Sequence, residues 1–286
     1  MQALFICAKG GDSRVKAKSR KNKKHVSHRR TVLKILLVVA VIIACISGFR
    51  IYKFYWEMKH LDDTADSVRK TAGDSISDAG IWHPDYAAIK GLNPDYIGWI
   101  QWDTGGAQAG SFQTDTAIVS EPVLKGETND TYLRHDIYHN YSSHGAVFMD
   151  CHDSLDDDNF VLYGHSLTGY KNDTHRFSRL QNMTDQGFFN EHRTFKMLYE
   201  DHADAYEAVS AFVINTYRDH FHYTQNTFAD ASAKQAWIDS AMSHSEVTTG
   251  TVPDANDKFI TLQTCADFGG SRYIIIGKRV SMILYQ

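Results

Sequence analysis

The sequence is poor in the residues that mark several common classes of protein. It has four prolines and four cysteines among 286 residues, which excludes a proline-rich chain, a collagen-like chain and a small disulfide-built scaffold. It contains no His-Glu-x-x-His, Cys-x-x-Cys or Asp-x-Asp-x-Asp-Gly pattern, so the common zinc and calcium signatures are absent and neither a metal nor a cofactor is expected. Hydrophobic residues make up 43% of the chain, which is the composition of a folded domain with a packed core.

Positive charge is concentrated at the N-terminus. Residues 1–34 hold 11 of the 30 Lys and Arg residues and a single acidic residue, Asp12. This segment therefore carries a net charge of +10, and the remainder carries −14. The basic region is thus separate from the main domain, and a nucleic-acid-binding function is not expected.

An uncharged apolar run, residues 35–49, follows the basic segment directly. With its flanks it gives 22 residues, 31–52, enough to cross a hydrocarbon core of about 30 Å. We interpret it as an uncleaved signal anchor. A cleaved signal peptide would need a better cleavage site than Cys45 to Gly48, and a buried core helix would not need the flanking cations. The positive-inside rule then places the tail, residues 1–30, in the cytoplasm and residues 53–286 outside the cell, as a single-pass membrane protein.

Residues 53–91 are charged and compatible with a helical juxtamembrane stalk, which includes a short helix over residues 85–91 closed by Gly91. The compact domain is expected to span residues 92–286. Two further helices are expected as inserts within it, over residues 177–189 and 231–243.

Short β-branched and aromatic runs dominate the compact domain and are separated by turn residues. Several lack polar alternation, which indicates burial on both faces or in a barrel wall. The sequence therefore predicts a mostly β fold, a closed barrel of about eight strands with helical inserts. The expected strands cover residues 96–102, 116–119, 145–149, 159–163, 194–199, 205–214, 259–264 and 273–277.

Two cysteines, Cys151 and Cys265, lie in the outer domain, where they form either one bridge or two free thiols. Cys265 ends a buried strand, His165 follows another, and Arg272 opens a third. A thiol that attacks a carbonyl needs a partner for its proton and a donor for the developing oxyanion. These three residues supply those types and are the candidate catalytic residues.

A serine nucleophile is a weaker alternative. Gly164-His-Ser-Leu-Thr-Gly169 nearly matches the Gly-x-Ser-x-Gly elbow of hydrolases, but Thr168 occupies the position of the second glycine. The segment after Ser166 also starts no helix, which the elbow requires.

Three motifs together resemble class B sortases. They are Asn93-Pro-Asp-Tyr-Ile-Gly-Trp-Ile100 at the start of the domain, Gly145-Ala-Val-Phe-Met-Asp150 followed by Leu162-Tyr-Gly-His165, and Thr261-Leu-Gln-Thr-Cys265 with Arg272. Their order and intervals match the family over about residues 92–280. The resemblance implies an extracytoplasmic cysteine transpeptidase, anchored in a Gram-positive membrane, on a closed β-barrel.

The resemblance also implies a role for each residue. Cys265 attacks after the Thr of a C-terminal sorting motif and forms a thioester, His165 transfers protons, and Arg272 holds the substrate carbonyl or oxyanion. Asp267 orients His165 or Arg272, or is simply solvated. Thr264 and Ser166 are further supporting candidates, although Ser166 stands where class B sequences usually have Asn.

The expected partners are secreted proteins with a sorting signal, of Asn-Pro-x-Thr type by resemblance, and an amine of the peptidoglycan precursor. A pilin lysine is an alternative acceptor. An alternative of another class is a catalytically silent, membrane-tethered binding module that retains the barrel. At Cys151, which replaces an aromatic residue often found in the family, either an inert buried thiol or a disulfide with Cys265 is expected.

Overall fold

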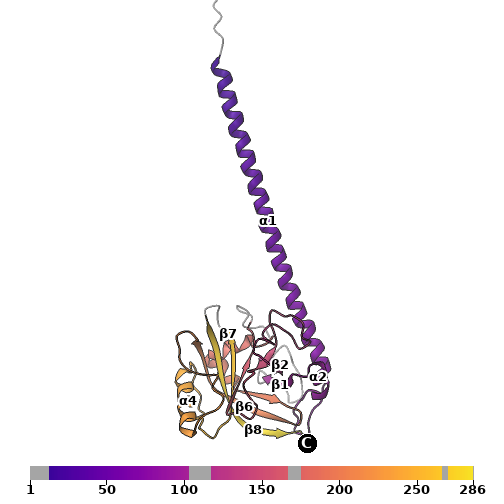
Figure 1. Cartoon of the computed structure of the whole chain (residues 1–286), viewed down its shortest axis with the longest axis vertical. Helices are drawn as coiled ribbons and strands as arrows, with labels where there is room; N and C mark the ends of the chain where they lie inside the picture. The colour runs from indigo at the N-terminus through magenta and orange to yellow at the C-terminus, as the bar shows by residue number, and fades with distance from the viewer. Residues whose placement is uncertain (1–12, 103–116, 167–174, 266–269, 286) are drawn as a thin grey trace, which may run out of the picture. The chain divides into compact units, whose positions relative to one another are not determined.

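The computed structural model describes residues 13–102, 117–166, 175–265 and 270–285, with the side chains described from residue 28 onwards. The chain divides into two compact units, residues 1–60 and 61–286. Figure 1 shows the elements of both units along the chain.

The N-terminal helix, α1 (Ser13–Ala72), contains the apolar run. Its part from His28 to Ala72 is long and apolar enough to cross a membrane, and none of its most apolar stretch is buried within the protein. The side chains of this stretch are exposed, among them Leu33, Leu36 and Ile43. A helix that leaves such side chains uncovered needs an apolar environment to cover them.

The second unit begins earlier than residue 92, where the sequence analysis places the start of the compact domain. The end of α1 is part of this unit, because Leu61, Val68 and Ala72 are buried. Val68 and Ala72 pack in one apolar cluster with Trp82 and with residues of the barrel. Residues 61–91, part of the stretch 53–91 expected to form the juxtamembrane helical stalk, therefore belong to the same compact unit as the barrel.

A short helix, α2 (Tyr86–Leu92), follows. The Asp85 side chain accepts a hydrogen bond from Ala88 N at 2.9 Å and so caps the helix N-terminus. The helix ends at Leu92, and Asn93 is its C-terminal cap. The buried Asn93 amide then donates hydrogen bonds to Tyr132 Oη and Ile137 O, which fixes the entry to the barrel.

Eight strands form a closed barrel in the order β1-β2-β3-β4-β7-β8-β6-β5, which confirms the predicted fold class. Two neighbouring pairs, β2 with β3 and β4 with β7, are parallel, and the other pairs are antiparallel. The strands are β1 (Tyr96–Trp102), β2 (Val119–Leu124), β3 (Val147–Met149), β4 (Asn159–Tyr163), β5 (Thr194–Leu198), β6 (His202–Asn215), β7 (Phe259–Cys265) and β8 (Ser271–Leu284).

The helical inserts differ in one respect from the expectation. The single helix expected over residues 177–189 is two elements, the 3-10 helix η1 (Ser178–Thr184) and α3 (Gln186–Glu191). Asp185 causes the break, because its side chain accepts a hydrogen bond from Phe188 N and starts a new helix. The other insert, α4 (Ala231–His244), matches the expected range within one residue and begins at the capping residue Asp230.

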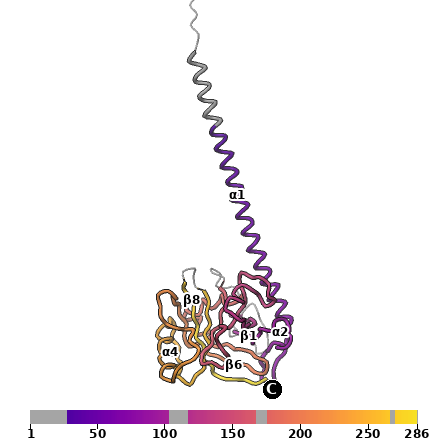
Figure 2. Tube along the Cα trace, viewed as in Figure 1, coloured from indigo at the N-terminus to yellow at the C-terminus, as the bar shows by residue number. Residues whose placement is uncertain are grey.

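Helices α2 and α4 are on opposite sides of the barrel (Figure 1, Figure 2). Trp237 of α4 packs edge-on against Phe259 of β7, with ring centroids 5.6 Å apart. Within the barrel cluster, Phe195 stacks between Trp102 and Tyr206. These stacked side chains are part of the packed interior of the barrel.

Candidate active site

The pairing of β4 with β7 places the histidine beside the cysteine. The two strands run parallel in register from Asn159 opposite Phe259 to Tyr163 opposite Gln263. Gly164 N continues this ladder by donating to Gln263 O at 3.2 Å. One more step in the same register brings His165 next to Cys265.

The pairing of β7 with β8 places the arginine on the other side of the cysteine. Cys265 lies directly opposite Arg272 across this antiparallel pair. Three adjacent strands therefore present histidine, cysteine and arginine in a row at one end of the barrel. Residues directly opposite on neighbouring strands have Cβ atoms about 4.5–5.5 Å apart and project to the same face.

A cavity of about 220 Å³ opens over this row. Because strand side chains alternate between faces, Tyr163, Gln263 and the catalytic candidates share the cavity face. The cavity is lined by Asn129, Asp130, Leu133, Phe148, Tyr163, Gly164, His165, Gln263, Cys265 and Arg272.

One ring nitrogen of His165 is already committed. His165 Nε2 lies 2.9 Å from Leu133 O. Because a carbonyl oxygen can only accept a hydrogen bond, Nε2 carries a proton and Nδ1 is the nitrogen left to exchange one. Burial lowers the pKa of His165, and the charges of Arg134 and Arg176 lower it further, whereas the hydrogen bond to Leu133 raises it. The neutral imidazole is therefore favoured.

Cys265 is a free thiol and is partly exposed, as is Arg272. The Arg272 Nη1 group donates to Ser271 O at 2.9 Å, which holds the guanidinium at the start of β8. Tyr223 lies near both residues. Burial raises the pKa of Tyr223, the charge of Arg272 lowers it and Cys265 raises it. Tyr223 therefore remains a neutral hydroxyl, and it donates to Gln263 Oε1 at 3.4 Å.

The Leu133 carbonyl, which contacts His165, is held in place by the close approach of Gly145. Gly145 has a φ of +52°, and a Cβ at this position would lie 2.3 Å from Tyr132 O and 2.7 Å from Leu133 O. Only glycine allows such a close approach of two backbone segments. Ala146 N then donates to Tyr132 O at 3.0 Å and keeps the segment in place.

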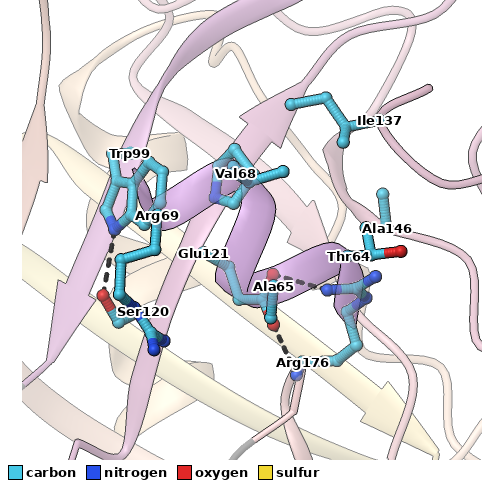
Figure 3. Close-up of a pocket in the computed structure, with 11 residues that line it drawn as sticks. Thr64, Ala65, Val68, Arg69, Trp99, Ser120, Glu121, Ile137, Ala146 and Arg176 are labelled. Carbon is cyan, nitrogen blue, oxygen red and sulfur yellow. Dashed lines mark hydrogen bonds and ion pairs between the residues drawn. The ribbon is translucent and has the colours of Figure 1, made fainter. Parts of the chain in front are cut away.

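The buried ion pair between Arg176 and Glu121 holds the Gly145 carbonyl in place. Arg176 Nε and Nη2 donate to Gly145 O at 3.0 and 2.8 Å, and Nη1 donates to Glu121 Oε2 at 2.5 Å. Glu121 Oε1 also accepts from Arg176 N at 3.0 Å. Figure 3 shows the Glu121 carboxylate facing the Arg176 guanidinium. Since Phe177 N donates to His165 O at 3.0 Å, the same segment also holds the His165 backbone.

The end of α1 lies against this ion pair. Thr64, Ala65 and Val68 line a small cavity together with Glu121 and Arg176 (Figure 3). His175 Nε2, one residue before Arg176, lies 3.1 Å from Asp62 Oδ1. The segment that follows the active-site histidine is thus contacted by the helix that leads into the domain.

The other predicted supporting residues occupy different places. Thr264 is fully buried on the face of β7 opposite to Cys265, and its hydroxyl has no hydrogen-bond partner among the described residues. Ser166 Oγ accepts from Gln181 Nε2 at 2.7 Å and does not line the cavity. Asp267 lies outside the described residues. Cys151 is a free, partly exposed thiol, so the expected buried thiol is wrong, and Cys151 forms no disulfide with Cys265 in this structure.

Sequence reasoning missed the residues that support His165. Glu121 and Arg176 are far apart in the chain and form part of no motif, so their pairing had no local signal. Gly145 did have a local signal, because it opens the motif that runs from Gly145 to Asp150. Its positive φ is visible only in the structure.

The fold is a closed barrel, and the site brings a candidate cysteine nucleophile together with a histidine and an arginine. No protein-family model matches the chain. Sortase B of Listeria monocytogenes is 27% identical over 257 residues, which cover 87% of this chain and 96% of the relative. Sortase B of Staphylococcus aureus is 25% identical over 240 residues, which cover 83% and 89%. The structure of Clostridium perfringens sortase B superimposes with a TM-score of 0.58 at 25% identity and covers 68% of this chain and 99% of that one.

These likenesses in sequence and fold support a class B sortase. They also support a sortase transpeptidase activity for the chain.

The Arg176 ion pair can be tested as the support of His165. We expect Arg176→Met to reduce kcat/KM for a peptide substrate by about 10–100-fold, since small displacements of reacting groups cost about this much. The acid limb of the pH profile should move to higher pH, because a positive charge that lowers the pKa of His165 is lost. Arg176→Lys should not restore activity, because an ammonium cannot make the forked contacts.

Arg193→Met is the matched control for this variant. It breaks another partly buried pair, with Glu207, whose residues lie outside the cavity. Both variants lose stability, but only Arg176→Met should shift the pH profile. An unchanged acid limb in Arg176→Met would contradict the positioning role.

The pH dependence follows from the environment of His165. Activity requires the Cys265 thiol and the His165 imidazole to hold one proton between them. It is lost below the pKa of His165, where the two groups hold two protons, and at alkaline pH, where they hold none. The profile of kcat/KM should therefore be bell-shaped. Because burial lowers the pKa of His165, the acid limb should lie below the ordinary histidine value of about 6.5. An acid limb above about pH 7, or a flat profile from about pH 5 to 10, would exclude this assignment.

Proposed function

We propose that this chain is a membrane-anchored, extracytoplasmic transpeptidase that cleaves a C-terminal sorting motif after Thr, forms a thioester on Cys265 and transfers the acyl group to a peptidoglycan amine. The observation that carries the proposal is the register of β4, β7 and β8, which brings His165, Cys265 and Arg272 together over one cavity. The proposal is also supported by the two sortase B relatives, whose alignments cover most of this chain.

In the first half-reaction the Cys265 thiolate attacks the carbonyl carbon of the motif's Thr. The C–S bond forms as the carbonyl becomes a tetrahedral oxyanion, and the C–N bond to the next residue then breaks. His165 Nδ1, which has taken the thiol proton, gives it to the leaving amine. The products are a thioester on Cys265 and a free amine, and His165 is neutral again.

In the second half-reaction an amine attacks the thioester carbon. His165 Nδ1 removes a proton from the incoming nitrogen, the C–N bond forms, and the C–S bond breaks. The proton passes to the leaving thiolate or to solvent. The new amide joins the cleaved protein to the acceptor without net oxidation or reduction.

Arg272 is proposed to stabilise the oxyanion in both half-reactions. Its guanidinium is one strand away from Cys265 and opens onto the same cavity. Its planar arrangement of donors suits an oxygen that gains charge in the transition state.

The acceptor and substrate are proposed from chemistry and resemblance. A solved sortase B is complexed with triglycine, and a Staphylococcus aureus sortase B structure is a substrate complex. By analogy, we assign this chain a sorting motif of Asn-Pro-x-Thr type and a primary amine as acceptor. The basic N-terminal tail and the apolar part of α1 support a single-pass topology with the tail in the cytoplasm and the catalytic domain outside.

The proposed reaction can be measured with the full chain in detergent micelles. Quenched peptides that contain an Asn-Pro-x-Thr motif should be cleaved after Thr, and triglycine should increase the rate and appear in the product. Mass spectrometry should show an acyl group on Cys265 when the amine is omitted. Cys265→Ala should abolish cleavage, whereas Cys45→Ala, which removes a thiol from the apolar helix, should not.

Two results would overturn this proposal. Cleavage that persists in Cys265→Ala would exclude the thioester route. A Cys265 thiol that is inert to alkylating reagents, with no cleavage of any motif peptide, would favour the silent binding module. Replacement of triglycine by a lysine peptide distinguishes wall anchoring from transfer to a pilin lysine.

The role of Arg272 has its own test. We expect Arg272→Lys to lower kcat by about 10²–10³-fold, the loss typical of a missing oxyanion donor. KM should change much less, because the interaction strengthens only in the transition state. Arg279→Lys, on the same strand but paired with Asp204 outside the cavity, is the control and should retain activity. Near-native kcat in Arg272→Lys would remove Arg272 from the mechanism.

A further inference from the structure

Three consecutive residues at the turn between β3 and β4 bring together a carboxylate, a thiol and an imidazole. Asp150, Cys151 and His152 each offer one donor atom, and these atoms all lie within 4.8 Å of one another. His152 Nδ1 is central, at 3.0 Å from Asp150 Oδ1 and 3.4 Å from Cys151 Sγ. None of the three residues has a part in the proposed reaction.

These separations fit a zinc ion. With Zn–N and Zn–O bonds of about 2.0–2.1 Å and a Zn–S bond of about 2.3 Å, ligand atoms at angles of about 90–109° lie roughly 2.9–3.6 Å apart. The two contacts of His152 Nδ1 fall in this range. Cys151 is partly exposed, so a rotation about its Cα–Cβ bond can bring Sγ closer to the carboxylate.

Neighbouring groups hold both oxygens of the Asp150 carboxylate in place. Oδ2 accepts hydrogen bonds from Tyr163 Oη at 2.7 Å and Asn129 Nδ2 at 2.9 Å, and Oδ1 accepts from His152 N at 3.0 Å. Asn129 Oδ1 also accepts from Cys151 N at 2.8 Å, which fixes the backbone of the turn. Such outer contacts orient metal ligands and sharpen their affinity.

An ion can reach the turn from solvent. The His152 side chain is 83% exposed, and Cys151 is a free thiol. Three protein ligands leave the fourth position of a tetrahedral zinc ion for water.

We propose that Asp150, Cys151 and His152 bind a divalent metal ion, with zinc as the preferred one. Binding releases the Cys151 thiol proton to solvent and replaces the hydrogen bond between His152 and Asp150 by two metal bonds. The site is separate from the catalytic row but adjoins it, because Asn129 and Tyr163 contact Asp150 and also line the active-site cavity. A bound ion is thereby placed to alter the cavity wall.

Cobalt(II) titration tests the proposal without any measurement of catalysis. The metal-free full chain in detergent, carrying Cys265→Ala so that the catalytic thiol cannot contribute, should bind one cobalt ion. The complex should show a thiolate-to-cobalt charge-transfer band and tetrahedral d–d bands, and one equivalent of zinc should displace the cobalt. Cys151→Ser should lose the charge-transfer band, and His152→Ala should weaken binding by about tenfold or more, the loss of one ligand.

His202→Ala provides the matched control. His202 Nδ1 lies 2.6 Å from Asp201 Oδ1, so this pair resembles His152 and Asp150 but lacks an adjacent cysteine. The His202→Ala substitution should leave cobalt and zinc binding unchanged. A charge-transfer band that survives in Cys151→Ser, no stoichiometric binding in the parent chain, or equal weakening by His202→Ala would each overturn the proposal.

A second measurement tests the connection to the cavity. Zinc should change peptide cleavage by the chain with an intact Cys265, and His152→Ala should remove this effect. Inhibition that persists in His152→Ala would mean that zinc acts on the catalytic pair directly, which would overturn the connection. The cobalt spectra do not depend on cleavage, so failure of the metal site and failure of the proposed transpeptidase are distinguished.

Discussion

The parallel pairing of β4 with β7 is the constraint on which the site depends. The two strands are about a hundred residues apart in the chain, yet their register runs without a shift from Asn159 opposite Phe259 to Tyr163 opposite Gln263. A slip of one residue would turn every side chain of one strand to the other face. It would move Cys265 out of the cavity while leaving the barrel closed. Apolar residues on these strands, including Phe160 and Ile260 in the core cluster, make such a slip costly.

The barrel and the row formed by His165, Cys265 and Arg272 are both predictable from the sequence, because both depend on local strand patterns. Residues 96–102 and 159–163 are apolar runs bounded by turn residues, and they match β1 and β4 in full. Cys265 and His165 stand at or just beyond strand ends, where side chains gather at the rim of a barrel. A local pattern does not show Asp185 dividing one expected helix into two, nor the packing of residues 61–72 on the domain, because both depend on contacts made after folding.

The support of His165 is where sequence reasoning fails most clearly. Glu121 and Arg176 are both buried, and transferring such charges from water costs several kcal/mol per ion before their attraction and hydrogen bonds offset it. The pair therefore adds little net stability compared with apolar residues of similar size. What it adds is geometry, because its hydrogen bonds tie β2, the Gly145 turn and the segment after His165 together.

That geometry bears on both halves of the proposed reaction. With Nε2 donating to Leu133 O, His165 has one nitrogen left for proton exchange, and in the proposed reaction this nitrogen serves the thiol, the leaving amine and the incoming amine in turn. A ring free to rotate would lose its alignment between these steps. Burial favours the neutral ring by lowering the pKa of His165, so the proposed mechanism needs the imidazolium only while it holds the transferred proton. In that mechanism the carbonyl of Leu133, kept in place by Gly145 and by the Arg176–Glu121 ion pair, is the contact that leaves a single nitrogen to complete the cycle.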